Sequence, residues 1–299
     1  MQLGAVFPQL EIGTDPAAIR DFAVAAEDAG YEHLVVFDHV LGIDRDRPVE
    51  TWRGSYALDA IPYTHQSMFH EPFVLFGYLS SFTSRIQFMT GVLVLPQRQT
   101  ALVAKQTAEV DLLSGGRLIL GVGVGWNSAE FEGMEADYGR RGRRIEEQIA
   151  LLRRLWAEPV VDFSGRFHRI DRAGINPRPT RQIPIWIGGI ADPVLERAGR
   201  VGDGWHVPRV LRTDPERLAE LRERVHEAGH AAGRDMSTFP VSTLLHQVDV
   251  PKDEQLGLIR RMEQAGVTHL AFNTMGAGLR SPAEHIASIR DFARRARAG

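Results

Sequence analysis

A carboxylate and an imidazole stand side by side at Asp38-His39, directly after the apolar run 33–37. Such a pair can hydrogen-bond a heterocycle and can give or take a proton near neutral pH. The same residues also suit a structural role, in which the aspartate caps a turn at a strand end and the histidine is half-buried. The pair therefore indicates either acid/base chemistry on a bound heterocycle or a capped strand end.

Glycines interrupt two strongly apolar runs further along the chain. Gly91 lies in the first, where a missing side chain indicates a bulge, a close approach to the backbone or relief of crowding. Gly121, Gly123 and Gly125 alternate along the second and lead into an irregular stretch. A dinucleotide-binding fingerprint requires Gly-x-Gly-x-x-Gly at the start of a helix, so this spacing does not match it. Alternating glycines instead predict a strand with one bare face, on which a flat ring can lie.

Another pair of glycines, Gly188 and Gly189, ends an apolar run and leads through Ile190 to a helix start at Asp192-Pro193. Backbone N–H groups at a helix N-terminus point toward one spot and suit a phosphate. The alternative is an ordinary turn in which the aspartate caps the helix. Because late-strand phosphate sites are frequent in α/β barrels, we favour the phosphate.

Other catalytic arrangements find little support. His206 follows a tryptophan at a strand end, and it is expected either to face the site or to be a hydrogen-bonded core residue. No pair of His, Asp or Glu has a recognisable metal-ligand spacing, so no metal site is predicted. The only lysines are Lys105 and Lys252, and neither follows a predicted strand, which argues against Schiff-base catalysis. No Gly-x-Ser-x-Gly motif is present, which argues against an α/β-hydrolase.

Alternating apolar runs and amphipathic windows predict the elements that position these residues. Eight strands, each followed by a helix, close a (β/α)₈ barrel, and nearly continuous apolar strands are typical of a sheet covered on both faces. We therefore predict an α/β fold with one TIM-barrel domain over residues 1–299. The predicted strands are 2–7, 33–37, 86–94, 118–124, 184–188, 204–207, 240–246 and 268–272. The predicted helices are 16–29, 72–83, 101–113, 141–156, 193–201, 215–232, 254–265 and 282–297.

Three segments interrupt this alternation. Residues 42–70 are far longer than an ordinary strand-to-helix loop and rich in aromatic side chains, which predicts a functional loop. Residues 126–140 form a second insertion, and residues 160–170 read as a small hairpin around Ser164-Gly165. The first two leave from strand C-terminal ends, where barrel active sites are built. We therefore expect a substrate pocket that includes Trp52, Tyr56, Trp126 and His206.

Composition excludes several classes of protein. The net charge is −3, so the chain lacks the excess of positive charge that is typical of nucleic-acid-binding proteins. The chain has no cysteine, which excludes disulfides and thiolate chemistry and fits a cytoplasmic enzyme. The N-terminus has no basic segment followed by a long apolar run, and no apolar stretch reaches the roughly 18 residues of a membrane span, so neither a secretion signal nor a membrane protein is expected.

Taken in order, these stretches resemble the luciferase-like monooxygenase superfamily, in particular its branch of oxidoreductases that use the deazaflavin coenzyme F420. The resemblance covers almost the whole chain, and it lies in the joint order of several modest motifs. The matching segments are residues 4–9, 26–31, Asp38-His39, Thr90-Gly91-Val92, 104–106, 112–117, 121–127, 184–189 and Asp203-Gly204-Trp205.

The resemblance implies roles for individual residues. It implies a cis peptide bond at Gly91–Val92, in a bulge that backs the central ring of the cofactor. Asp38 would hold the edge of that ring, and His39 would be the acid/base group. The cofactor would be lined by Val124, Gly125 and Asn127, and its phosphate would be received by Gly188, Gly189 and Ile190.

Two segments depart from the family pattern. Trp126 stands where one dehydrogenase branch has a glutamate, which argues against that branch's sugar-phosphate substrate. The segment Gln97-Arg98-Gln99 replaces the Arg-His-Pro that is usual in the family.

The resemblance implies an enzyme that transfers a hydride between coenzyme F420 and a small organic molecule. An alternative is an FMN-dependent monooxygenase that uses O₂ and reduced flavin. In either case a partner reductase or dehydrogenase would supply the reduced cofactor. A third possibility is a non-catalytic flavin- or deazaflavin-binding protein, and a barrel lyase or isomerase acting on a sugar phosphate is a fourth. A homodimer is expected from the family.

Overall fold

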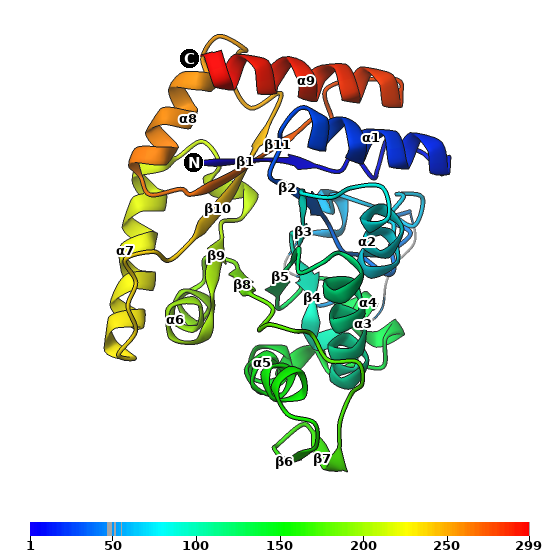
Figure 1. Ribbon diagram of the computed structural model, residues 1–299, viewed down its shortest axis with the longest axis vertical. Helices are drawn as coiled ribbons and strands as arrows, with labels where there is room; N and C mark the ends of the chain where they lie inside the picture. The colour runs from blue at the N-terminus through cyan, green and yellow to red at the C-terminus, as the bar shows by residue number, and fades with distance from the viewer. Residues whose placement is uncertain (47–49, 51, 55, 299) are drawn as a thin grey trace.

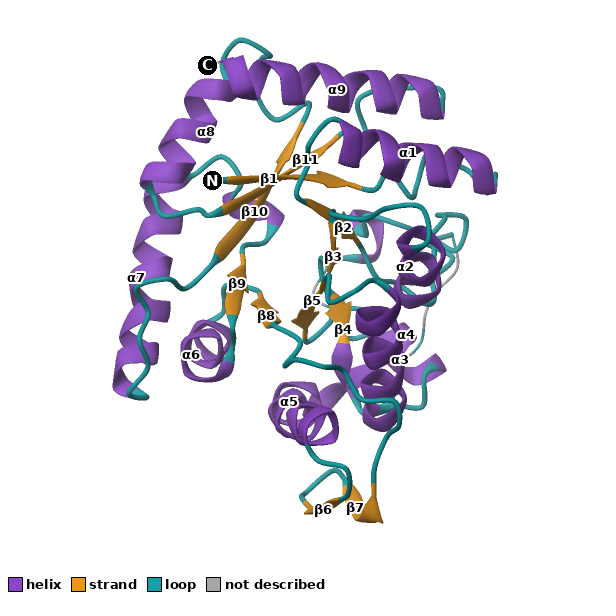
Figure 2. Ribbon diagram, viewed as in Figure 1, coloured by secondary structure: helices purple, strands orange, loops and turns teal. Residues whose placement is uncertain are grey.

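Parallel strands arranged in a closed ring form the centre of the computed structural model, which describes residues 1–46, 50, 52–54 and 56–298. Seen along the barrel, the strands surround its axis and the large helices form an outer layer (Figures 1 and 2). The sheet runs in the order β3-β2-β1-β11-β10-β9-β8-β5-β4, and a further pairing of β3 with β5 closes it. The predicted α/β barrel is confirmed.

The barrel strands are β1 (Gln2–Val6), β2 (His33–Val36), β3 (Gln87–Thr90), β4 (Leu93–Val94), β5 (Leu118–Gly123), β8 (Ile185–Gly188), β9 (Gly204–His206), β10 (Val241–His246) and β11 (His269–Asn273). The outer helices are α1 (Pro16–Asp28), α2 (Pro72–Ser80), α3 (Thr100–Leu113), α5 (Arg141–Ala157), α6 (Asp192–Val201), α7 (Pro215–Ala231), α8 (Gln255–Gln264) and α9 (Pro282–Ala298). Short 3₁₀ turns lie at η1 (Leu58–Ala60), η2 (Leu95–Gln97), η3 (Tyr138–Arg140) and η4 (Arg209–Leu211). In the part of the chain that the structure describes, no helix combines the length and hydropathy that crossing a bilayer requires.

Acidic residues before proline begin several of the outer helices. The Asp15 carboxylate accepts the Ala17 N–H at 3.0 Å, and Glu71 and Asp214 cap α2 and α7 by accepting the N–H three residues ahead. In each case the following proline occupies the first turn, where its missing N–H has no consequence. These caps orient the helices that follow the strand ends and so help to shape the mouth of the barrel.

Apolar side chains fill both sides of the sheet. A small cluster inside the barrel is built around Met89, Ile119 and Trp186, and a larger core lies between the strands and the outer helices. This double burial accounts for the nearly continuous apolar strands in the sequence.

Three predicted elements differ from the structure by more than one residue at a boundary or by a break, and one helix was not predicted. The third barrel strand is not continuous over 86–94, because Gly91 and Val92 bulge out and separate β3 from β4. The helix predicted at 72–83 ends at Ser80. The hairpin is present as β6 (Val161–Ser164) and β7 (Arg169–Ala173), but its second strand runs beyond residue 170. The stretch after β5, predicted as irregular, contains the helix α4 (Ser128–Gly133).

Candidate active site

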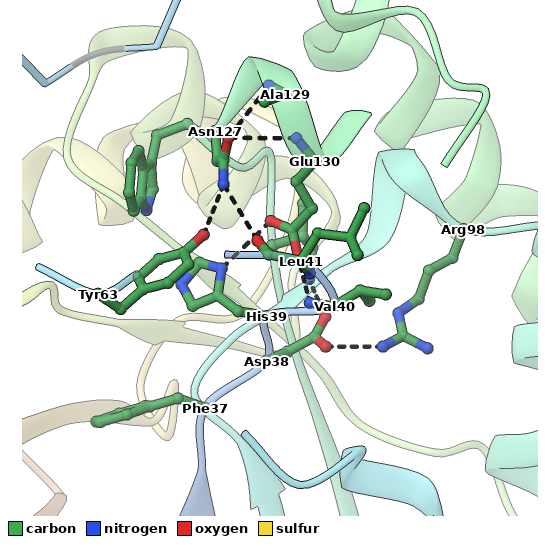
Figure 3. A network of polar contacts seen from close by, with 12 residues as sticks. Phe37, Asp38, His39, Val40, Leu41, Tyr63, Arg98, Asn127, Ala129 and Glu130 are labelled. Carbon is green, nitrogen blue, oxygen red and sulfur yellow. Dashed lines mark hydrogen bonds and ion pairs between the residues drawn. The ribbon is translucent and has the colours of Figure 1, made fainter. Parts of the chain in front are cut away.

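His39 lies just beyond the end of β2, at the C-terminal mouth of the barrel. Its side chain is 16% exposed, and its Nδ1 lies 3.3 Å from the Glu130 carboxylate of α4 (Figure 3). The Tyr63 ring packs on the imidazole at 4.0 Å between ring centroids, and Phe69 approaches it edge-on at 5.0 Å. Among the described residues, Nε2 has no hydrogen-bond partner. A half-buried imidazole with one nitrogen held and the other free is suited to exchanging a proton with a bound molecule.

Glu130 is a residue of this site that was not predicted from the sequence. Its side chain is 1% exposed, and besides His39 it accepts the backbone N–H groups of Val40 and Leu41. Its position follows from α4, where Asn127 caps the helix and Glu130 is the third residue. An asparagine followed three residues later by a glutamate is a helix-start pattern, so a signal for both the helix and the glutamate was present.

Asp38 is buried behind His39 instead of open to the mouth. Its carboxylate lies 2.7 Å from the Arg98 guanidinium and accepts the Val94 N–H at 2.9 Å. Arg98 also reaches Glu71, the capping residue of α2, at 3.0 Å. Asp38 thus joins the end of β2 to β4 and α2, and its expected contact with a ring edge stays a prediction.

The Gly91–Val92 peptide is cis, as the resemblance implied. The Gly91 N–H is held by the Val36 carbonyl at 2.8 Å, so the bulge remains attached to β2. Gly91 and Val92 are both partly exposed at the mouth of the barrel. The bulge is therefore available to a molecule bound there.

The predicted bare face of β5 is wrong, because the bulge fills it. Gly121 and Gly123 are buried. A Cβ on Gly121 would lie 1.9 Å from the Thr90 carbonyl oxygen, and one on Gly123 would lie 2.5 Å from a Val92 methyl group. These glycines make room for the bulge, and the bulge in turn can support a ring.

The residues that follow β5 divide into two groups. Val124, Gly125 and Trp126 are partly exposed. Asn127 is buried: its Oδ1 accepts the Ala129 and Glu130 N–H groups, while its Nδ2 donates to the Tyr63 hydroxyl at 2.8 Å and to the Leu41 carbonyl. The Asn127 amide is thus fully engaged within the protein, and a cofactor contact by this side chain stays a prediction.

Gly188, Gly189 and Ile190 are partly exposed at the start of α6. Gly189 has φ +127°, which favours glycine, and its carbonyl accepts the Trp205 indole N–H at 2.8 Å. The alternative for this turn, in which Asp192 caps α6, is wrong. The N-cap is Ala191, which has no side-chain cap, and Asp192 lies inside the helix and pairs with Arg224 at 2.9 Å. Pro193 has no N–H, and the N–H groups of Gly189, Val194 and Leu195 donate to backbone carbonyls, which leaves the N–H groups of residues 190–192 to meet a phosphate.

The expected substrate-pocket residues do not all lie together. Trp126 contacts Trp52 and Tyr56, with ring centroids 6.2 and 4.8 Å away, and it lies 5.8 Å from His39. His206 instead lies inside the barrel, with Nδ1 2.7 Å from the Ser242 hydroxyl and Nε2 directed at Gly91. Burial lowers the pKa of His206 to about 4, so the ring is neutral at physiological pH.

The functional loop predicted at 42–70 includes residues outside those described, and its described part supplies Tyr63 and Phe69 to the site. Burial and the nearby Glu130 carboxylate raise the pKa of Tyr63, so its hydroxyl stays protonated. Within the described ranges, no group of three or more His, Asp or Glu side chains could hold a metal ion.

Comparison with known proteins adds independent information. Residues 2–256 match the Luciferase-like monooxygenase family. An uncharacterized protein of Mycobacterium tuberculosis is 34% identical over 265 residues, covering 88% of this chain and 86% of that protein. The F420-dependent glucose-6-phosphate dehydrogenase of Amycolatopsis mediterranei is 32% identical over 196 residues, covering 64% of this chain and 53% of that enzyme.

Among solved structures, an F420-dependent secondary alcohol dehydrogenase in complex with an F420-acetone adduct is similar to this chain, with a TM-score of 0.73 and 18% identity over 97% of both chains. At this level of identity, the likeness shows the fold alone.

Proposed function

The chain belongs to the luciferase-like monooxygenase family, a family of oxidoreductases, and on that basis we propose that it transfers a hydride between coenzyme F420 and a small organic substrate at the mouth of its barrel. The observation that carries the proposal is the position of His39, partly exposed at the end of β2 with Nδ1 held by Glu130. The F420-dependent relative favours the deazaflavin over FMN.

The residues at the mouth fit such a cofactor. The partly exposed bulge at Gly91 and Val92 can support a flat ring, and the N-terminus of α6 offers backbone N–H groups to a phosphate. When bound, coenzyme F420 supplies a carbon that accepts or donates a hydride. Asp38 holds β4, and thereby the bulge, through the Val94 N–H.

His39 accepts or donates the proton that is transferred together with the hydride. In the direction of alcohol oxidation, Nε2 accepts the hydroxyl proton of the substrate while the carbinol carbon loses its hydride. In the direction of carbonyl reduction, the protonated ring returns the proton to the oxygen. The aromatic rings of Tyr63, Phe69 and Trp126 around the imidazole favour an uncharged substrate with apolar surface.

A fluorescence titration of the apo-protein with oxidised F420, reduced F420 and FMN tests the cofactor. We expect saturable binding of F420 and weaker binding of FMN. Tight FMN binding without a response to F420 would replace this proposal by the flavin-dependent monooxygenase.

His39→Gln tests the chemistry. We expect kcat with a panel of neutral alcohols and ketones to fall roughly 10²- to 10⁴-fold, while F420 binding changes little. Binding of F420 by the wild type without turnover of any substrate on the panel would favour a non-catalytic binding protein.

A further inference from the structure

We propose that Glu130 is a positioning residue, which keeps the proton of neutral His39 on Nδ1 and leaves Nε2 as the nitrogen that exchanges the substrate proton. The inference rests on the proposed function in one respect, the catalytic use of Nε2. The tautomer itself follows from the geometry and can be tested without any substrate.

The Glu130 carboxylate holds one short segment from two directions. Oε1 accepts the backbone N–H groups of Val40 and Leu41, and Oε2 lies 3.3 Å from His39 Nδ1 (Figure 3). The side chain is 1% exposed, so water cannot readily substitute for these donors. An ionised carboxylate only accepts hydrogen bonds. The nitrogen that faces it must therefore carry the proton.

The surrounding rings keep the imidazole in this orientation. Tyr63 packs on one face at 4.0 Å with 32° between the planes, and Phe69 meets the ring edge-on at 84°. The Tyr63 hydroxyl is held by Asn127, which also caps α4 at Glu130. The N-terminal end of α4 thus fixes both the hydrogen-bond partner of His39 and the ring stacked on it.

A second glutamate–histidine pair in the same chain shows what differs at this site. Glu147 accepts the backbone N–H groups of residues 166–168 and lies 2.8 Å from His168 Nδ1. There, however, Nε2 is also engaged, 2.7 Å from the Thr100 hydroxyl. The His168 ring is held at both nitrogens and is structural, whereas His39 is held at Nδ1 and has no Nε2 partner among the residues that the structure describes.

The substitution Glu130→Gln inverts the hydrogen bond with little change of shape. The amide oxygen can take the place of Oε1 and accept both backbone N–H groups, which puts the NH₂ group opposite His39 Nδ1. Because an amide NH₂ only donates, Nδ1 becomes the acceptor and the proton moves to Nε2. A comparable tautomer inversion behind the catalytic histidine of serine proteases lowers kcat by about 10⁴.

¹⁵N NMR of the histidine side chains, assigned through His39→Gln and read in the neutral form of the ring over a pH series, reports the tautomer. We expect a protonated Nδ1 and an unprotonated Nε2 for His39 in the wild type and the reverse in Glu130→Gln, with turnover lowered roughly 10²- to 10⁴-fold. Glu147→Gln, the matched control, should leave both the His39 signals and turnover unchanged.

The wild-type spectrum alone can overturn the proposal. A neutral His39 with its proton on Nε2 contradicts it, whether or not the variant folds, and so does a Glu130→Gln variant that keeps the wild-type His39 signals. If the tautomer changes as expected but the wild type turns over no substrate, the proposed function fails and the role of Glu130 in setting the tautomer stands.

Discussion

The Asp38 carboxylate is buried, and a buried carboxylate needs a positively charged partner. Its side chain is 1% exposed, and the Arg98 guanidinium that faces it is 10% exposed. The same guanidinium lies 3.0 Å from Glu71, so one arginine links the end of β2 to the cap of α2. Removing one member of a buried pair leaves a charge without compensation, which costs far more than losing a surface pair. Arg98 is therefore expected to be structurally essential.

Arg98→Met should lower the free energy of unfolding by about 3–5 kcal/mol, because the Asp38 carboxylate stays buried without its partner. Urea denaturation measures the change. Adding Asp38→Asn should recover part of the loss, since the buried charge is then gone. The matched control is Arg20→Met, which removes an exposed, solvent-screened pair with Asp21 and should cost far less. A loss for Arg98→Met no larger than for Arg20→Met would contradict this assignment.

Which site residues could be predicted from the sequence depended on how far apart they lie along the chain. Asp38 and His39 are neighbours in the chain, so their common position at the end of a strand was visible in the sequence. Glu130 lies 91 residues from His39, and nothing local ties the two together. Its place in a helix was signalled by Asn127, yet the direction of its side chain follows only from how α4 packs on the segment after β2.

At the scale of elements, β5 and the bulge between β3 and β4 are built around each other. The bulge pushes the Thr90 carbonyl and the Val92 side chain toward β5, and Gly121 and Gly123 leave the space that they need. Thr90 completes the contact by donating its hydroxyl to the Gly121 carbonyl at 2.6 Å. The sequence pattern predicted that something approaches these glycines, but a neighbouring strand and a flat ring predict the same pattern.

Alanine substitutions at Gly121 and Gly123 distinguish a steric clash with the backbone from a steric clash with a side chain. Gly121→Ala sets a methyl group 1.9 Å from the Thr90 carbonyl oxygen, and no side-chain truncation can relieve that contact. Gly123→Ala meets a Val92 methyl group at 2.5 Å, so Val92→Ala should relieve it. We expect each single change to lower the free energy of unfolding by about 1–3 kcal/mol or more. Thermal unfolding should show recovery for Gly123→Ala with Val92→Ala and none for Gly121→Ala with Val92→Ala.

At the scale of the whole molecule, the strand pattern predicted the closed barrel, because eight βα units leave few other arrangements. The contents of its interior were less predictable. His33, His206 and His269 all occupy the barrel, and both ring nitrogens of His33 lack a partner among the described residues. Alternation along a strand indicates that a histidine points inward, but not that two others meet it there.

These buried histidines should make the stability of the barrel fall in mild acid. Burial lowers the pKa of His33 to about 3 and those of His206, His246 and His269 to about 4, against about 6.5 in the unfolded chain. Below pH 6.5 the unfolded chain therefore binds protons that the folded chain excludes. The stability is fully present above about pH 6.5 and is lost as the pH falls toward the folded values, by about 1.4 kcal/mol per pH unit for each histidine.

His33→Leu tests the contribution of one ring. Near neutral pH we expect little change in the free energy of unfolding, because a buried ring without hydrogen bonds is replaced by an apolar side chain of similar size. At about pH 5 the variant should be more stable than the wild type by about 2 kcal/mol, since its unfolded state no longer gains that proton. Urea unfolding of the variant and the wild type near neutral pH and at about pH 5 measures both differences in the free energy of unfolding. Parallel pH profiles for the variant and the wild type would mean that His33 can be protonated inside the folded barrel.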